Sequence, residues 1–159
     1  MARDMRRRAL LASAAAVGTA SLAGCPTPPW SEDPTTVDGA EVTFRREYDG
    51  DRPGPDHGPV DAAELRRDLD AAPPRLVVAG RILDGARECY RPALIDAALD
   101  EGTLSLRVET RNDPEWEGNA CPDVAQEHRY SVAVDFIEAS VSDRVVVRHG
   151  DRAVLEESV

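Results

Sequence analysis

Lysine is absent from this 159-residue sequence, and aromatic residues make up only 4% of it. All 19 basic residues are arginine, and 30 acidic residues outnumber them. An acidic surface repels nucleic-acid phosphates and anionic lipid headgroups, so neither is expected as a partner of the folded domain. Because aromatics are scarce, the expected core consists of valine, leucine, isoleucine and alanine.

A long apolar run is also missing. The run from Ala9 to Ala23 has 15 residues, whereas a transmembrane helix needs about 20. Arg6-Arg7-Arg8 precede this run, and Leu22-Ala23-Gly24-Cys25 end it. A basic segment, a short apolar run and small residues at its end predict a secretory signal peptide over residues 1–24.

Two motifs in this segment resemble known export signals. Arg7 and Arg8, followed by Ala9-Leu10-Leu11, resemble the twin-arginine signal that a translocase reads. The sequence Leu-Ala-Gly-Cys resembles a lipobox, which implies that Cys25 becomes the lipidated first residue of the mature protein. The resemblance therefore implies a protein on the outer face of the cytoplasmic membrane, anchored to the bilayer without spanning it.

Cleavage before Cys25 makes the protein still more acidic. It removes four arginines and one aspartate, which leaves 15 basic and 29 acidic residues and a net charge of −14. High acidity with arginine in place of lysine resembles secreted proteins of halophilic archaea, in which concentrated salt screens the repulsion between carboxylates. An ordinary acidic protein from a GC-rich organism is the alternative.

The chain has three cysteines, Cys25, Cys89 and Cys121. If Cys25 is lipidated, the other two remain as a pair in an oxidising compartment, and a disulfide is expected. Closing a loop of about 33 residues contributes on the order of 3–4 kcal/mol in the chain-entropy account. A nucleophilic Cys89 and a thiolate metal site are the alternatives, but there is no C-x-x-C motif and no histidine close to a cysteine.

Residues 25–40 are predicted to form a proline-rich tether, and residues 41–159 a single β-rich domain. The tether has little to bury. Its Trp30 contacts either the bilayer interface or the domain, and the sequence does not decide between them. The domain, with close to 120 residues, is large enough for one core.

Alternating apolar residues predict the strands of this domain. The predicted strands are Glu41–Tyr48, Leu76–Leu83, Thr103–Thr110, Arg129–Ile137, Asp143–His149 and Arg152–Glu156. The last two are joined by His149-Gly150-Asp151 as a short hairpin connection. Several short strands with turns between them favour a small antiparallel β-sandwich or barrel-like domain, and the strands at Thr103 and Arg129 are expected to be neighbours or to share one core.

One helix is expected over Asp61–Asp70, since Ala62, Leu65, Arg66 and Leu69 have helical spacing. Asp61 is its expected N-cap, with Glu64 three residues on. Pro92–Asp100 is ambiguous, because its apolar residues also have helical spacing, yet short strands flank it.

The three histidines, His57, His128 and His149, give little sign of a metal site. They are separated by 71 and 21 residues and fall in predicted loop or hairpin positions, whereas zinc sites usually include a short-spaced pair. Exposed or turn histidines are therefore expected. Asp49-Gly50-Asp51 resembles the start of a calcium loop, but prolines interrupt the pattern and Val60 stands at its twelfth position.

No motif of nucleophilic or cofactor chemistry is present, so we expect a non-enzymatic protein without a cofactor. The candidate binding region consists of two loops, Gly85–Pro92 and Asn119–Pro122. If Cys89 and Cys121 join, these loops present a binding surface made by Arg87, Tyr90, Arg91 and Trp116. The alternative is that Tyr90 and Trp116 simply cover the disulfide and the end of the sheet.

The segment from Leu76 to His149 also resembles uncharacterised lipoproteins of halophilic archaea and, more distantly, small β-domains that bind or stabilise proteases. The features that carry the resemblance are Val77-Val78-Ala79-Gly80, Cys89-Tyr90, Leu104–Val108, Tyr130–Phe136 and Val145-Val146-Val147. The resemblance implies a β-fold and a binding role. Because the domain is tethered, disulfide-bonded and without a catalytic or cofactor motif, its expected partner is another envelope protein or a small ligand. The alternative function is a small hydrolase or metal-binding protein that uses His128 or His149 with nearby acids.

Overall fold

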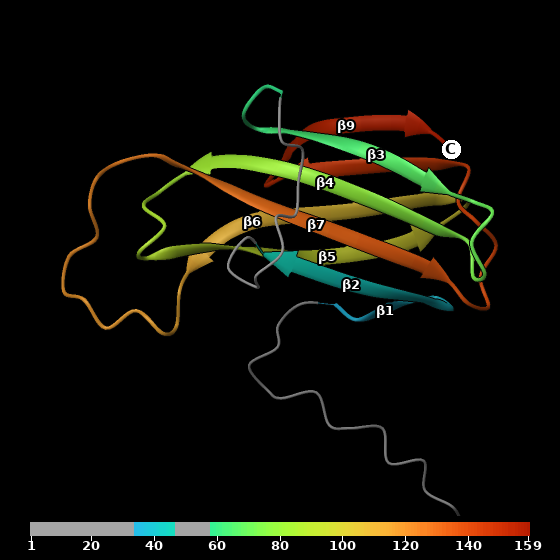
Figure 1. Cartoon of the computed structure of the whole chain (residues 1–159), viewed down its shortest axis with the longest axis horizontal. Helices are drawn as coiled ribbons and strands as arrows, with labels where there is room; N and C mark the ends of the chain where they lie inside the picture. Colours follow the sequence, from blue (N-terminus) through green and yellow to red (C-terminus); the bar gives the residue numbers. More distant parts are fainter. Residues whose placement is uncertain (1–33, 47–57) are drawn as a thin grey trace, which may run out of the picture.

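The computed structural model describes residues 34–46 and 58–159, which form nine strands and no helix (Figure 1). No helix long and apolar enough to span a membrane occurs in these two ranges. The predicted signal peptide, with Arg7 and Arg8, lies outside the described residues, as do Cys25, Trp30, His57 and the Asp49-Gly50-Asp51 segment.

The first sheet has five strands in the order β1-β2-β7-β4-β3, and every neighbouring pair is antiparallel. Its strands are β1 (Thr36–Val37), β2 (Ala40–Arg46), β3 (Ala62–Asp68), β4 (Arg75–Asp84) and β7 (Gln126–Phe136). Since β1 begins at Thr36, the last residues of the predicted tether belong to the sheet.

The second sheet has four strands in the order β5-β6-β8-β9. Its strands are β5 (Tyr90–Asp100), β6 (Thr103–Asn112), β8 (Arg144–His149) and β9 (Arg152–Ser158). The pair β6–β8 is parallel, whereas the other pairs are antiparallel. Parallel neighbours need a long connection, and here β7 provides it by crossing to the other sheet.

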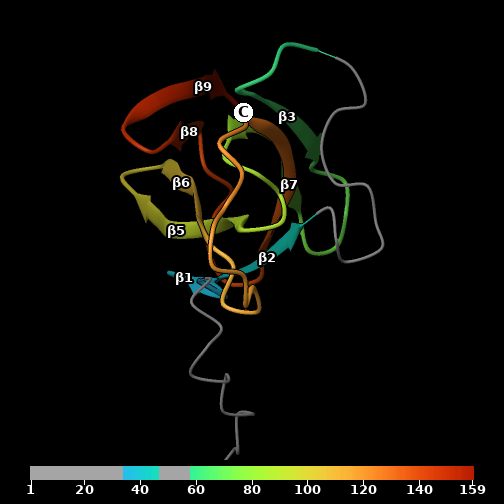
Figure 2. The same ribbon diagram turned by 90° about the vertical axis from the view of Figure 1, so that its left-hand side faces the viewer.

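The two sheets face each other as a sandwich (Figure 2). Alternate residues of both sheets project inward and form one apolar core, as the period of a strand requires. Leu104, Leu106 and Val108 of β6 meet Val132 and Val134 of β7 in this core. The predicted β-sandwich is thus confirmed, and the strands at Thr103 and Arg129 share a core from opposite sheets.

The predicted helix over Asp61–Asp70 is wrong, because this segment is the edge strand β3. Seven residues of β3 pair with β4, from Ala62 opposite Arg81 to Asp68 opposite Arg75. Asp61 has a φ of 59°, which a helix N-cap does not adopt. Pairing with a buried neighbour has overridden the helical preference of Ala, Glu, Leu and Arg.

The ambiguous segment Pro92–Asp100 is also a strand and belongs to β5. Its register with β6 shifts between Leu94 and Asp96, which marks a β-bulge at Ile95. A bulge inserts one extra residue and breaks the two-residue period. The apolar residues on either side of it therefore acquire a spacing that resembles a helix.

Tyr130 is the largest fully buried side chain of the core. Its ring stacks on Phe44 with centroids 5.9 Å apart and lies over Gly80, its register partner on β4. A Cβ atom at position 80 would meet the ring at 2.2 Å. Glycine is therefore required at this position, because any side chain would displace the ring.

We expect Gly80→Ala to lower the free energy of unfolding by about 2 kcal/mol or more, since overpacking a closed core usually costs about 1–3 kcal/mol. Gly85→Ala is the matched control: its Cβ would meet the ring of Tyr90 at 2.4 Å, but Tyr90 is only half-buried and its ring has room to move. Urea unfolding of both variants measures the difference. A cost at position 80 no larger than that at position 85 would contradict this account of the core.

Candidate functional site

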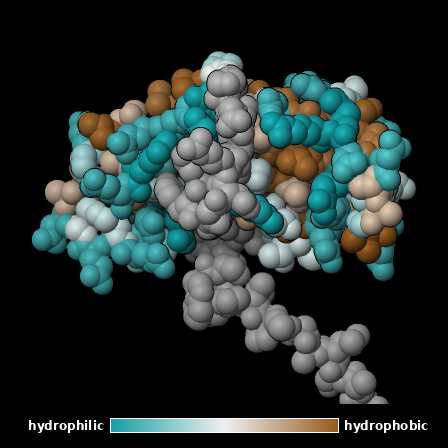
Figure 3. Space-filling model, viewed as in Figure 1, coloured by the Kyte–Doolittle hydropathy of each residue, from teal (hydrophilic) through white to brown (hydrophobic). Residues whose placement is uncertain are grey.

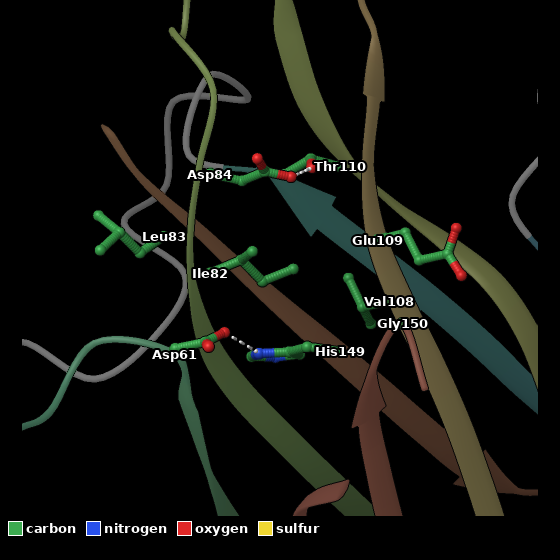
Figure 4. A pocket seen from close by; sticks show the side chains of 9 residues that line it. All are labelled: Asp61, Ile82, Leu83, Asp84, Val108, Glu109, Thr110, His149 and Gly150. Carbon is green, nitrogen blue, oxygen red and sulfur yellow. Dashed lines mark hydrogen bonds and ion pairs between the residues drawn. The ribbon is translucent and has the colours of Figure 1, made fainter. Parts of the chain in front are cut away.

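A pocket of about 340 Å³ opens where β4 of the first sheet meets β6 and β8 of the second (Figure 4). The register places it at the end of the sandwich where β4 and β6 finish and β7 begins. The residues that line it are Asp61, Ile82, Leu83, Asp84, Val108, Glu109, Thr110, His149 and Gly150.

Strand alternation decides which of these side chains face the pocket. Ile82 and Val108 come from opposite sheets and belong to the buried core, so they form an apolar floor. The next residues along each strand, Leu83 and Glu109, point away from it (Figure 4). The polar groups that remain at the pocket are those of Asp61, Asp84, Thr110 and His149.

Asp84 links the two sheets at one side of the pocket. One carboxylate oxygen accepts a hydrogen bond from the backbone N–H of Gly85 at 2.8 Å. The other accepts one from the hydroxyl of Thr110 on β6. Both donors are neutral, so Asp84 is held in place while its negative charge faces solvent.

Asp61, His149 and Tyr130 form a hydrogen-bonded chain that runs from the pocket into the core. Asp61 accepts from Nδ1–H of His149 at 2.9 Å, because a carboxylate can only accept. Nε2 of His149 then accepts from the Tyr130 hydroxyl at 2.8 Å. Arg152 donates to the second oxygen of Asp61. Three elements far apart in sequence are thus joined at one wall of the pocket.

Burial is the largest influence on the pKa values of His149 and Tyr130 in this hydrogen-bonded chain. It lowers the pKa of His149 from its usual value, against the opposing effect of the hydrogen bond and charge of Asp61, and Arg152 adds to the lowering. Burial also raises the pKa of Tyr130 far above its usual value, as the charge of Asp61 does to a smaller extent. Both groups are therefore neutral near pH 7.

The expectation of exposed or turn histidines is wrong for His128 and His149, which are 1% and 9% exposed. Each occupies an inward position on a strand, and Nε2–H of His128 donates to the Gly85 carbonyl at 2.9 Å. These hydrogen bonds offset the free-energy cost of removing a polar ring from water. Within the described ranges, no three or more His, Cys, Asp or Glu residues are grouped so as to hold a metal ion.

The predicted disulfide between Cys89 and Cys121 is present, with Cα atoms 5.9 Å apart. It joins the β4–β5 turn, residues 85–89, to the β6–β7 loop, residues 113–125. We call these two segments the disulfide end; the loop projects beyond the strands in Figure 1. The disulfide therefore lies at the same end of the sandwich as the pocket.

The four residues of the predicted binding surface all lie at or beside this end, where internal contacts hold them. Arg87 donates to the carbonyl of Glu127 at 2.6 Å, and Arg91 pairs with Asp113 at 3.6 Å. The half-buried rings of Tyr90 and Trp116 pack against Gly85 and Gly118 respectively. The two aromatic rings thus lie over glycine backbone, and Tyr90 also lines a second pocket.

This second pocket has a volume of about 390 Å³ and shares Asp84 with the first. Its lining residues are Asp84, Gly85, Tyr90, Cys121, Pro122, Asp123, Val124 and Ala125. Val124 is 50% exposed. Two adjoining pockets therefore lie at this end of the sandwich. One has an apolar floor and lies beside the disulfide end, and the other is bordered by Tyr90 and Val124.

Comparison of the chain with protein-family models, curated proteins and solved structures finds no match. The function must therefore be argued from the site. Sequence reasoning missed Asp84 and Thr110, although both stand where a predicted strand ends. Asp61 was considered only as the N-cap of a helix that does not form. Its contact with His149 could therefore not be foreseen.

The lowered pKa of His149 predicts a pH-dependent stability. The unfolded chain binds a proton near pH 6.5, the usual histidine pKa, before the folded protein does. The contribution of neutral His149 to the free energy of unfolding is therefore complete above that pH. It declines as the pH falls below 6.5, by at most about 1.4 kcal/mol per pH unit. We expect urea unfolding between pH 7.5 and 5.5 to show a smaller stability loss in His149→Gln than in the wild type. Equal losses would show that His149 does not contribute.

Proposed function

We propose that this protein is a lipoprotein tethered by Cys25 to the outer face of the cytoplasmic membrane, whose β-domain is a non-enzymatic binding module. Support for this location comes from the Arg7-Arg8 pair and the Leu-Ala-Gly-Cys sequence, which resemble a twin-arginine signal and a lipobox. The acidic, lysine-free composition supports a halophilic source.

The observation that carries the binding role is the construction of the disulfide end. A covalent bond joins its two segments, and a hydrogen bond from Arg87 connects them to β7. Beside them, a hydrogen bond from Thr110 of β6 to Asp84 holds the end of β4. Two pockets that share Asp84 open at this end of the sandwich, one of them lined by the disulfide end itself. Recognition loops held rigidly before a partner arrives lose little conformational entropy on binding, so such an end favours association.

The alternative function, a small hydrolase or metal-binding protein, requires His128 or His149 to be available. His128 bonds to the Gly85 carbonyl, and both nitrogens of His149 are engaged. The hydroxyl next to Nε2 of His149 belongs to Tyr130, which is 0% exposed, so a substrate has no access to it. These contacts favour a structural role for both histidines over a catalytic one.

The charge of the domain restricts its partner. A net charge near −14 for the mature chain disfavours nucleic acid and anionic lipid headgroups. We therefore propose another envelope protein as the partner, with the membrane contacted only through the lipid anchor.

The location is tested by substitution in the signal segment. We expect Arg7→Lys with Arg8→Lys to block export, and Cys25→Ser to release the protein or leave the precursor unprocessed. Arg3→Lys is the matched control, because Arg3 stands outside the arginine run. Cell fractionation and intact mass measurement identify each product. Wild-type protein found wholly in the cytosol at full precursor mass would refute this location.

The binding role is tested by cross-linking and affinity capture of the lipidated protein from membranes at high salt. We expect Val124→Ser to remove most of the captured partner, because Val124 lies at the disulfide end and is 50% exposed. Ile137→Ser is the matched control, since Ile137 is 52% exposed and follows β7 at the opposite end.

If Val124→Ser and Ile137→Ser reduce the amount of captured partner equally, the binding surface lies elsewhere than at the disulfide end. If nothing is captured, and the purified protein retains stoichiometric zinc or cleaves a substrate in a His149-dependent manner, the alternative function replaces the binding module.

A further inference from the structure

We propose that the pocket between Asp61 and Asp84 binds an arginine or lysine side chain of a partner protein. This inference rests on the proposed binding function and names the chemistry that the site recognises. The charge at the pocket, the shape of its floor and its position beside the second pocket each support it.

Asp84 supplies a negative charge that no basic side chain among the described residues neutralises through an ion pair. Its hydrogen bonds come from the Gly85 N–H and the Thr110 hydroxyl, both neutral. No basic side chain forms an ion pair with Asp84 anywhere in residues 34–46 and 58–159. An ionised carboxylate has about four acceptor positions, so it can accept further N–H donors without giving up the bonds that fix it.

The rest of the pocket does not cancel this charge. Asp61 pairs with Arg152, and His149 is neutral near pH 7 because burial lowers its pKa. Glu109 points away (Figure 4) and lies 3.5 Å from Arg107. The groups at the pocket therefore carry a net negative charge concentrated at Asp84, which attracts a cation.

The shape of the pocket favours a cation on an aliphatic stem over a bare metal ion. Its floor is made by Ile82 and Val108, which are apolar. Arginine and lysine bury their methylene stems against apolar surface while their charged ends remain at polar groups. A volume of about 340 Å³ lies near the lower end of the range of about 300–1,000 Å³ for ligand pockets, which suits one long side chain.

The surroundings favour a side chain of a protein over a free amine. The second pocket begins at the same Asp84 and continues past Tyr90 and Val124. Leu83, next to Asp84, is 46% exposed. Half-buried Tyr90 and exposed Val124 in the second pocket offer apolar contacts to residues next to the cation in an extended segment. Figure 3, which shows the outer face of the first sheet, also has apolar areas between its polar groups.

The test uses NMR titration of the isotope-labelled full chain at low salt with three capped tripeptides, Ala-Arg-Ala, Ala-citrulline-Ala and Ala-norleucine-Ala. We expect the arginine peptide to shift the backbone amides of Ile82, Asp84, Val108 and Gly150, and the two uncharged peptides to bind more weakly. Asp84→Asn should weaken binding of the arginine peptide about three- to five-fold, as expected for a solvent-exposed ion pair. In this variant the Asn oxygen can accept from the Gly85 N–H, and the Asn amide N–H can donate to the Thr110 hydroxyl, which accepts as well as donates. Both contacts can therefore persist, and the variant should keep the fold.

Asp100→Asn is the matched control, because it removes the same charge from an exposed position at the end of β5. Equal binding of the arginine and citrulline peptides would overturn the inference, and so would equal weakening by Asp84→Asn and Asp100→Asn. If the arginine peptide causes no shifts while membrane capture still depends on Val124, the inference fails and the binding function stands. If both experiments fail, the proposed function fails as well.

Discussion

A buried hydrogen bond between the Tyr130 hydroxyl and Nε2 of His149 connects the two sheets of this protein inside their common core. Tyr130 belongs to β7 and His149 to β8, so the bond fixes the position of one sheet relative to the other. A buried polar group without its partner costs about 1–3 kcal/mol, and loss of this bond would leave two such groups. Gly80 makes the arrangement sterically feasible, since only a residue without Cβ leaves room for the ring of Tyr130.

The same chain of hydrogen bonds also shapes the pocket. Asp61 precedes the edge strand β3, and its bond to His149 holds this segment against the end of β8. Arg152, the first residue of β9, adds a second connection to Asp61. On the other side, Asp84 and Thr110 connect β4 to β6. The two carboxylates are therefore fixed by contacts that also maintain the sandwich, so the geometry of the site follows from the stability of the fold.

Most of the sheet could be predicted from the sequence because each strand has one buried face. Leu104, Leu106 and Val108 alternate with polar residues, and the core confirms that they project inward. The segment at Ala62 was misread because an edge strand buries little, so its helical propensities dominated the pattern. The pocket could not be predicted for a related reason. Asp61, Asp84 and His149 meet only through pairings between distant strands, and local spacing carries no information about such contacts.

The disulfide restrains the loops at one end of the sandwich. Loops of this length usually remain mobile, and ordering them on binding costs free energy. Here Cys89 and Cys121 join the turn after β4 to the loop before β7, while Arg87 donates to the Glu127 carbonyl across the same gap. At the opposite end, by contrast, the β5–β6 connection is a tight turn at Glu101 and Gly102. This restraint lies beside two pockets that share Asp84, a carboxylate without an ion pair among the residues that the structure describes. The partner that we propose, with its basic side chain, would therefore meet a site formed in advance.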